Sequence, residues 1–164
     1  MKHLSKFVLL AGVILATVFC IMPAYGAMVE QTIDQLVDAS ELVAQARVTK
    51  LVSSWNDDHD FIFTLVTLTV EDVRKGNAKL GSTVDVLVPG GIMDGTGLKV
   101  EHSADFEAGQ NVIVFLRPID SDLFGVTAWE QGKYTVVQNM ITENGLPRAD
   151  FVGQIDDAIA ASKR

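Results

Sequence analysis

One stretch decides the fold class of this chain: residues 61–73 read FIFTLVTLTVEDV. The run is rich in β-branched and aromatic side chains, and it contains neither glycine nor proline. Such side chains favour extended backbone, because a branched side chain packs well on a pleated surface and loses freedom in a helix. The stretch therefore predicts a β-strand, the strongest one in the sequence.

Further strand-like segments lie on both sides of it. They share period-two alternation or a short apolar run bounded by turn residues, and they are 41–52, 83–88, 111–116, 124–129 and 134–140. The run at 111–116 is nearly all apolar, on both faces, which is typical of a central strand. The segment at 41–52 can also be read as the continuation of a helix through Ala46. Residues 90–110 form a glycine-rich connection, with a short strand expected at 98–101.

Helical patterns occur only near the two ends of the domain. Thr32 and Gln35 match a capping box at the start of a helix over 32–42. Asp150 is the expected N-cap of a closing helix. The apolar stripe of that helix is Phe151, Val152, Ile155, Ala158 and Ile159. Short strands with turns about every ten residues, and few helices, predict a small barrel or sandwich.

Residues 1–26 have the layout of a secretory signal peptide. Two lysines precede an uncharged apolar run at 7–21, and Ala24 and Gly26 place small residues before a cut between positions 26 and 27. The alternative is an uncleaved anchor helix over 7–28, which is just long enough to span a bilayer. We expect cleavage, export to the periplasm or the extracellular space, and no stable membrane span afterwards.

Composition excludes several function classes. The only cysteine, Cys20, lies in the leader, so residues 27–164 offer no thiolate chemistry and no disulfide. It follows Phe19, whereas lipoprotein signals carry a small residue there, so lipidation is not expected. Residues 27–164 hold 11 basic and 21 acidic residues, a formal charge of −10, which disfavours nucleic-acid binding. We expect one domain over 27–164, with no cofactor and no metal.

The densest polar cluster is Asp57, Asp58, His59 and Asp60. Carboxylates and imidazole are metal ligands, but the spacing does not match an EF-hand loop. We interpret the cluster as a solvated loop tip. Ser103, His102 and Asp105 formally supply a catalytic triad, but neighbours in sequence rarely converge, and neither a Gly-x-Ser-x-Gly elbow nor an HExxH helix is present.

Residues 90–97 read GGIMDGTG and resemble a phosphate loop only superficially. Neither a Lys-Ser/Thr pair nor a helical pattern follows, so neither a Walker A motif nor a dinucleotide fingerprint is satisfied. The glycines permit positive φ, and long connections on barrels often carry function. Ile92, Met93 and Asp94 are therefore candidate partner-binding residues.

Trp55 and His102 complete the candidate partner-binding residues. Trp55 opens a polar loop, where an exposed indole would indicate binding; packing over the end of the barrel is the structural alternative. Trp129 lies in a strand-like segment and is expected in the core or at its edge.

The order of several short motifs resembles a widespread group of exported bacterial proteins of uncharacterised function, each with one domain behind a signal peptide. The motifs are SELVAQARV at 40–48, Trp55, the threonine-rich strand around Thr64 and Val66, VRKG at 73–76, VPGG at 88–91, FEAGQ at 106–110 and VIVFL at 112–116. The resemblance covers roughly residues 33–160.

The Lys-Gly turn, the Gly-Gln turn and the VFL strand are also similar to the OB-fold barrel of netrin-like and tissue-inhibitor-of-metalloproteinase domains. The resemblance implies an OB-like barrel. Together with the strand and helix patterns above, it leads us to expect a mostly β domain: a five- or six-stranded OB-like barrel with a short N-terminal helix and a C-terminal helix. In those inhibitors the mature N-terminal cysteine coordinates the protease zinc, whereas residues 27–164 contain no cysteine. Inhibition would need another mechanism here.

These observations lead to three functional hypotheses. The first is an exported, non-enzymatic binding module that contacts a protein, for example a secreted or envelope protease; a broad apolar patch on the glycine-rich loop would favour it. The second is a small-ligand or glycan binder that uses Trp55 or Trp129, and aromatic side chains lining a groove would favour it. The third, ranked last, is a hydrolase built on His102.

Overall fold

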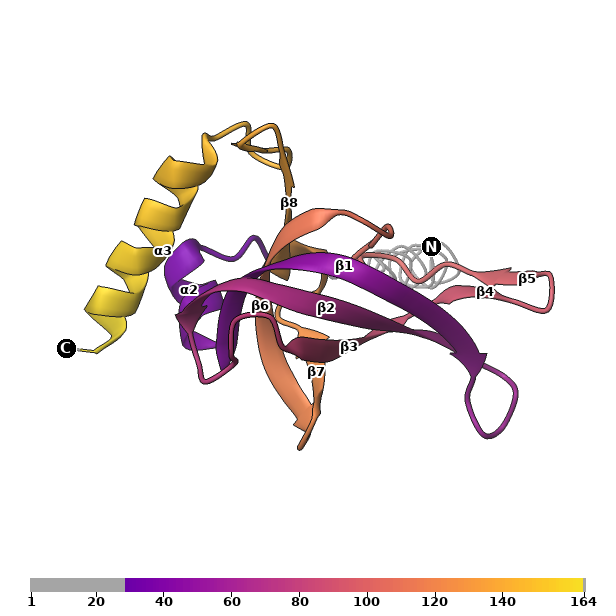
Figure 1. The fold of residues 1–164 in the computed structure, drawn as a ribbon. Helices are drawn as coiled ribbons and strands as arrows, with labels where there is room; N and C mark the ends of the chain where they lie inside the picture. Colours follow the sequence, from indigo (N-terminus) through magenta and orange to yellow (C-terminus); the bar gives the residue numbers. More distant parts are fainter. Residues whose placement is uncertain (1–28, 164) are drawn as a thin grey trace, which may run out of the picture.

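The computed structural model of the chain describes residues 29–163 (Figure 1). The expected signal peptide and its cut before Ala27 lie outside the described residues. Within residues 29–163, no helix is both long enough and apolar enough to cross a membrane.

The described chain is mostly β, with two α-helices, as the sequence predicts. In order, the elements are α2 (Ile33–Asp38), β1 (Leu42–Trp55), β2 (Ile62–Lys75), β3 (Thr83–Pro89), β4 (Gly91–Met93), β5 (Thr96–Leu98), β6 (Asn111–Asp120), β7 (Leu123–Val126), the 3-10 helix η1 (Trp129–Gly132), β8 (Lys133–Val137), β9 (Met140–Ile141) and α3 (Arg148–Ser162). The stretch quoted first above forms β2, and the alternating segment before it forms β1 rather than a longer helix.

Seven strands join in one sheet, in the order β1-β2-β3-β7-β6-β8-β9, and β1 also pairs with β6. The pairing sequence β1-β2-β3-β7-β6 therefore returns to β1. All pairings are antiparallel except that of β3 with β7. Strands β4 and β5 form a separate two-stranded sheet.

Strand β6 separates two hydrophobic cores, because successive side chains on a strand point to opposite faces. Val112, Val114 and Leu116 pack in one core with the inner residues of β1, β2 and β3. Ile113 and Phe115 pack in the other, beneath α2 and α3. The predicted double-sided burial is confirmed for residues 112–116.

The two helices lie against each other at one end of the sheet (Figure 1). The capping box of α2 is confirmed, since the Thr32 side chain accepts from the backbone of Gln35 and the Gln35 side chain accepts from that of Thr32. The predicted Asp150 cap is wrong: α3 begins at Arg148 after Pro147, and Asp150 lies in its first turn. Four residues of the predicted stripe are buried, and Val152 is partly exposed.

The glycine-rich connection differs from its prediction. The strand expected at 98–101 is replaced by a hairpin of β4 and β5, whose turn is Asp94-Gly95. Both turn residues have positive φ, 51° and 77°, which is the geometry of a type I′ hairpin turn and suits an Asp-Gly pair. This hairpin holds three of the candidate partner-binding residues.

Trp129 also differs from its prediction. Strand β7 ends at Val126, and Trp129 begins η1, so its predicted place in a strand is wrong. Half of its surface is exposed (50%), so it lies outside the core rather than in it. Gly132 explains the turn, because a Cβ there would collide with the carbonyl oxygen of Thr127. Only glycine therefore allows the chain to fold back so closely after β7.

The sequence prediction is also wrong about the ends of two strands. Strand β6 continues past Leu116 through Pro118 to Asp120, and a register irregularity after Pro118 accommodates the missing N–H. The segment at 134–140 is two strands, because Gln138 and Asn139 have φ of 50° and 64° and turn the chain.

Candidate functional site

Two hairpins project from the same end of the molecule, away from the helices (Figure 1). The pairing of β1 with β6 ends at Arg47, whereas its pairing with β2 continues to Trp55. The outer half of the β1–β2 hairpin therefore extends beyond β6, and β4 lies next to both of its strands. At the tips, the Trp55 indole Nε1 donates to Oδ2 of Asp94 at 3.3 Å, so two of the candidate residues meet.

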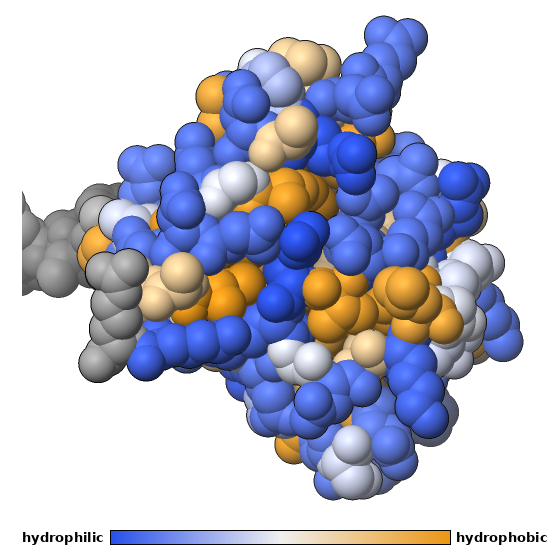
Figure 2. Space-filling model, turned by 60° about the vertical axis from the view of Figure 1, so that its left-hand side comes forward, coloured by the Kyte–Doolittle hydropathy of each residue, from blue (hydrophilic) through white to orange (hydrophobic). Residues whose placement is uncertain are grey.

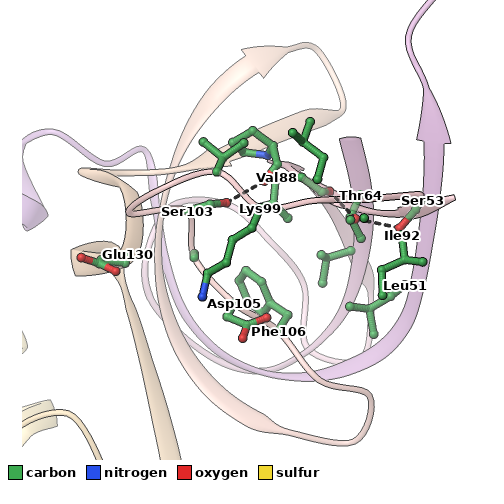
Figure 3. Close-up of a pocket in the computed structure, with 18 of the residues that line it drawn as sticks. Leu51, Ser53, Thr64, Val88, Ile92, Lys99, Ser103, Asp105, Phe106 and Glu130 are labelled. Carbon is green, nitrogen blue, oxygen red and sulfur yellow. Dashed lines mark hydrogen bonds between the residues drawn. The ribbon is translucent and has the colours of Figure 1, made fainter. Parts of the chain in front are cut away.

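A cavity of about 790 Å³ lies beneath the β4–β5 hairpin, and we call it the hairpin cavity (Figure 3). Its walls come from β1 to β5 and from the segment 99–106. Its apolar lining includes Leu51, Val66, Val88, Ile92, Leu98 and Phe106. Val66, Val88 and Phe106 are at least nine-tenths buried, which makes the floor of the cavity part of the protein core. Ile92 differs from them, because 75% of its surface is exposed.

A chain of hydroxyl groups fixes the hairpin over this floor. Thr64 Oγ1 donates to the carbonyl oxygen of Gly90 at 2.7 Å, so the 2.9 Å bond between Ser53 and Thr64 uses the Ser53 proton. Ser103 Oγ donates to the carbonyl oxygen of Pro89 at 2.8 Å. A Cβ at Gly91 would collide with the hydroxyl oxygens of Ser53 and Thr64. The close approach of β4 to the hydroxyl pair therefore requires glycine.

Charged groups gather at one side of the cavity. His102 Nδ1 lies 2.7 Å from Oε1 of Glu130, and its Nε2 lies 3.9 Å from Glu101. The hydrogen bond to Glu130 raises the pKa of His102 above its ordinary value of 6.5, and the charges of both glutamates act in the same direction. Figure 3 shows the Lys99 side chain extended across the cavity toward Asp105.

The formal triad of Ser103, His102 and Asp105 is not assembled as a nucleophile and base. Ser103 gives its proton to Pro89, and His102 pairs with Glu130. A serine is activated when its hydroxyl donates to the base, and that contact is absent between these described residues.

The acidic loop beside Trp55 is held by its own contacts. The Asn56 side chain bonds to the side chain of Asp60 and accepts from the backbone of Asp60 and Phe61. The His59 ring stacks on Trp55 with 6.5 Å between ring centres. In the part of the chain that the structure describes, no three His, Cys, Asp or Glu side chains converge as a metal site would require.

The five candidate residues thus divide into two groups. Ile92 and His102 line the hairpin cavity, while Trp55 and Asp94 join the two hairpin tips next to it. Met93 lies between them on β4 and is partly buried. Sequence reasoning missed the lining residues Lys99, Phe106 and Glu130. Glu130 had no recognisable signal, because it is 28 positions from its partner His102.

Figure 2 brings the α3 side forward and shows a mostly hydrophilic face with separate apolar patches. Isolated patches of this kind are ordinary on protein surfaces.

No protein-family model matches the chain, and no curated protein matches it in sequence.

Proposed function

We propose that residues 27–164 form an exported, OB-like barrel that acts as a non-enzymatic binding module. The closed pairing sequence of β1, β2, β3, β7 and β6 supports the barrel, since OB-folds are partly open barrels of five strands. The likeness to netrin-like and tissue-inhibitor-of-metalloproteinase domains becomes part of the same proposal. In this proposal, α2, α3 and the β8–β9 pair are additions to the barrel formed by β1, β2, β3, β7 and β6.

The binding surface in this proposal is the hairpin cavity together with the exposed face of β4. One observation carries it: a cavity of about 790 Å³ has a buried apolar floor, and the hairpin above it exposes Ile92. An exposed isoleucine beside an apolar cavity is costly in water, and contact with a partner would remove both surfaces from water. We propose a protein partner, such as a secreted or envelope protease, that inserts an apolar side chain beneath the hairpin.

Two sets of contacts support a binding role over catalysis. The protons of Ser53, Thr64 and Ser103 are already donated to other protein oxygens. His102 pairs with the Glu130 carboxylate, and Ser103 gives its proton to Pro89 rather than to His102, so this histidine does not activate the neighbouring serine as a nucleophile.

Capture of a partner from exported fractions tests the proposal. The full chain is expressed, the exported product is used as bait, and Ile92→Asp is compared with Val137→Asp. Val137 is a matched control, because it is an exposed apolar strand residue on β8, outside the cavity lining. We expect Ile92→Asp to lose the captured protein while Val137→Asp retains it. Equal capture by both variants, with equal melting temperatures, would refute the hairpin cavity as the binding surface.

A small-ligand function is a second candidate, because Trp129 is half exposed. Its side chain lines a separate hollow that does not include the hairpin.

A further inference from the structure

A second hollow lies where β3 and β7 separate, and we call it the seam pocket. The parallel pairing of these strands covers only Asp85 with Leu123 and Val86 with Phe124. Beyond those pairs, β3 continues to Pro89 along β2, and β7 continues to Val126 along β6. The gap between them opens into a hollow of about 320 Å³, at the small end of the roughly 300–1,000 Å³ range of ligand sites.

The wall of the seam pocket is apolar, with one cationic group. Its main side chains are Phe63, Leu87, Arg117, Ile119, Val126 and Trp129. Ile119 and Trp129 are both about half exposed, which is unusual for two large apolar side chains facing one hollow. Gly125 makes this possible: a Cβ there would lie 3.1 Å from Ile119 and 3.8 Å from the Arg117 guanidinium, so the bare backbone lets both side chains lie over β7.

The position of Trp129 is fixed by backbone constraints. Ala128 and Trp129 have φ of 51° and 60°, two consecutive non-glycine residues in the left-handed region. Such conformations persist where surrounding contacts hold them, and they are concentrated at functional sites. The neighbouring Gln131 side chain is held by the backbone of Gln31, whose N–H donates to it at 2.6 Å. The turn that carries the Trp129 indole is therefore fixed in position by its contacts.

The polar groups of the seam pocket select the ligand class. Its only lining side chains with hydrogen-bonding groups are Ser103, Arg117 and Trp129, and Ser103 has given its proton to Pro89. A sugar would leave most of its hydroxyls without partners against this wall, which is unfavourable. Arg117 makes no ion pair with any residue in the described range 29–163. A guanidinium in that state suits a carboxylate, which it can bind through two parallel hydrogen bonds.

We propose that the seam pocket binds a small, flat apolar molecule that carries one carboxylate. The apolar body lies against Trp129 and Ile119, and the carboxylate pairs with Arg117. This inference gives the second candidate function its ligand class. It does not depend on the hairpin cavity, although Val88, Pro89, Ser103 and Ala104 form a wall shared by the two hollows.

The indole N–H signals of the two tryptophans test the proposal by nuclear magnetic resonance. The chain has only Trp55 and Trp129, so Trp55 is an internal control at the hairpin tips. The exported protein is titrated with 2-naphthoate and, separately, with the uncharged 2-naphthamide. We expect a saturable shift of the Trp129 signal with naphthoate, an unmoved Trp55 signal, and affinity for naphthamide weaker by about tenfold or more.

Variants assign the carboxylate contact. Arg117→Gln should weaken naphthoate binding by about tenfold and abolish the preference over naphthamide. Arg47→Gln is the matched control, because Arg47 is an exposed arginine on β1 that pairs with Glu71, and it should bind as the unaltered protein does. The proposal is overturned if naphthoate leaves Trp129 unshifted at millimolar concentration, if both indoles shift alike, or if Arg117→Gln binds both compounds unchanged. None of these results bears on partner capture through Ile92.

Discussion

His102 and Glu130 are joined twice, although 28 positions separate them in the sequence. The backbone N–H of Glu130 donates to the carbonyl oxygen of His102 at 2.9 Å, and the Glu130 carboxylate contacts His102 Nδ1 at 2.7 Å. This double contact ties the segment 99–106, which forms one wall of the hairpin cavity, to η1. The shape of the cavity therefore depends partly on a contact that titrates.

The contact between the His102 ring and the Glu130 carboxylate predicts that the stability of the protein depends on pH. The folded-state pKa of His102 is raised above 6.5, so its contribution is fully present below about pH 6.5 and is lost as pH rises through the folded-state value. Unaltered protein should melt above Glu130→Gln at about pH 5.5, and this difference should shrink as the pH rises through the folded-state pKa of His102. Glu101 also faces His102, so Glu101→Gln is the control and should change the profile less. A difference in melting temperature that stays constant with pH would contradict the ion pair.

Core and hairpin substitutions should differ strongly in their effects. Phe115 and Leu116 have no exposed surface, so truncation of either to alanine should cost about 2–5 kcal/mol of unfolding free energy. Met93→Ala and Asp94→Asn, on the hairpin, should each cost less than about 0.5 kcal/mol, because asparagine tolerates the positive φ of position 94 as aspartate does. Denaturant unfolding of the four variants measures this contrast. If Met93→Ala destabilises the protein as much as Leu116→Ala, the hairpin belongs to the core and cannot be a free binding surface.

Glycine at position 91 should be essential to the cavity. An added methyl group would collide with the Ser53 and Thr64 hydroxyls, at a backbone φ of 145° that side chains rarely adopt. Gly91→Ala should therefore cost about 2 kcal/mol or more of stability, through strain and lost hydrogen bonds. Gly95→Ala is the matched control, since it too has positive φ but meets nothing within 4 Å. Equal melting temperatures for the two variants would show that β4 does not lie tightly against the hydroxyl pair.

The leader makes a separate prediction. Ala24 and Gly26 at the small-residue positions predict cleavage before Ala27. Intact-mass analysis of the exported protein should give the mass of residues 27–164. A product that retains Lys2, or one with lipid on Cys20, would contradict the cleavage prediction.

The sequence was most informative where a side-chain pattern reflects burial. Alternation in β1, the β-branched run of β2 and the double-sided apolar run of β6 each report which faces are packed, so these strands were placed nearly correctly. The capping box of α2 was also readable from the sequence, because its two residues, Thr32 and Gln35, lie one helical turn apart. Local pattern and local geometry agree at these positions.

The remaining features depend on contacts that no local pattern encodes. The β4–β5 hairpin was missed because three-residue strands are too short to show a period, although Asp94-Gly95 was a usable turn signal. Trp129 was misplaced because the turn that exposes it depends on Gly132 passing close to Thr127. The cavity residue Glu130 meets the site only through the folded chain, because its partner His102 is 28 positions away.

Site-directed photocrosslinking at position 92 tests the central claim most directly. A photoreactive phenylalanine analogue replaces Ile92 in the full chain, and the same analogue replaces Val137 in a parallel chain as the exposed control. After irradiation of exporting cells, the account predicts one discrete protein adduct from position 92 and none from position 137. The absence of an adduct at 92, or equal adducts from both positions, would contradict a protein partner bound at the hairpin cavity.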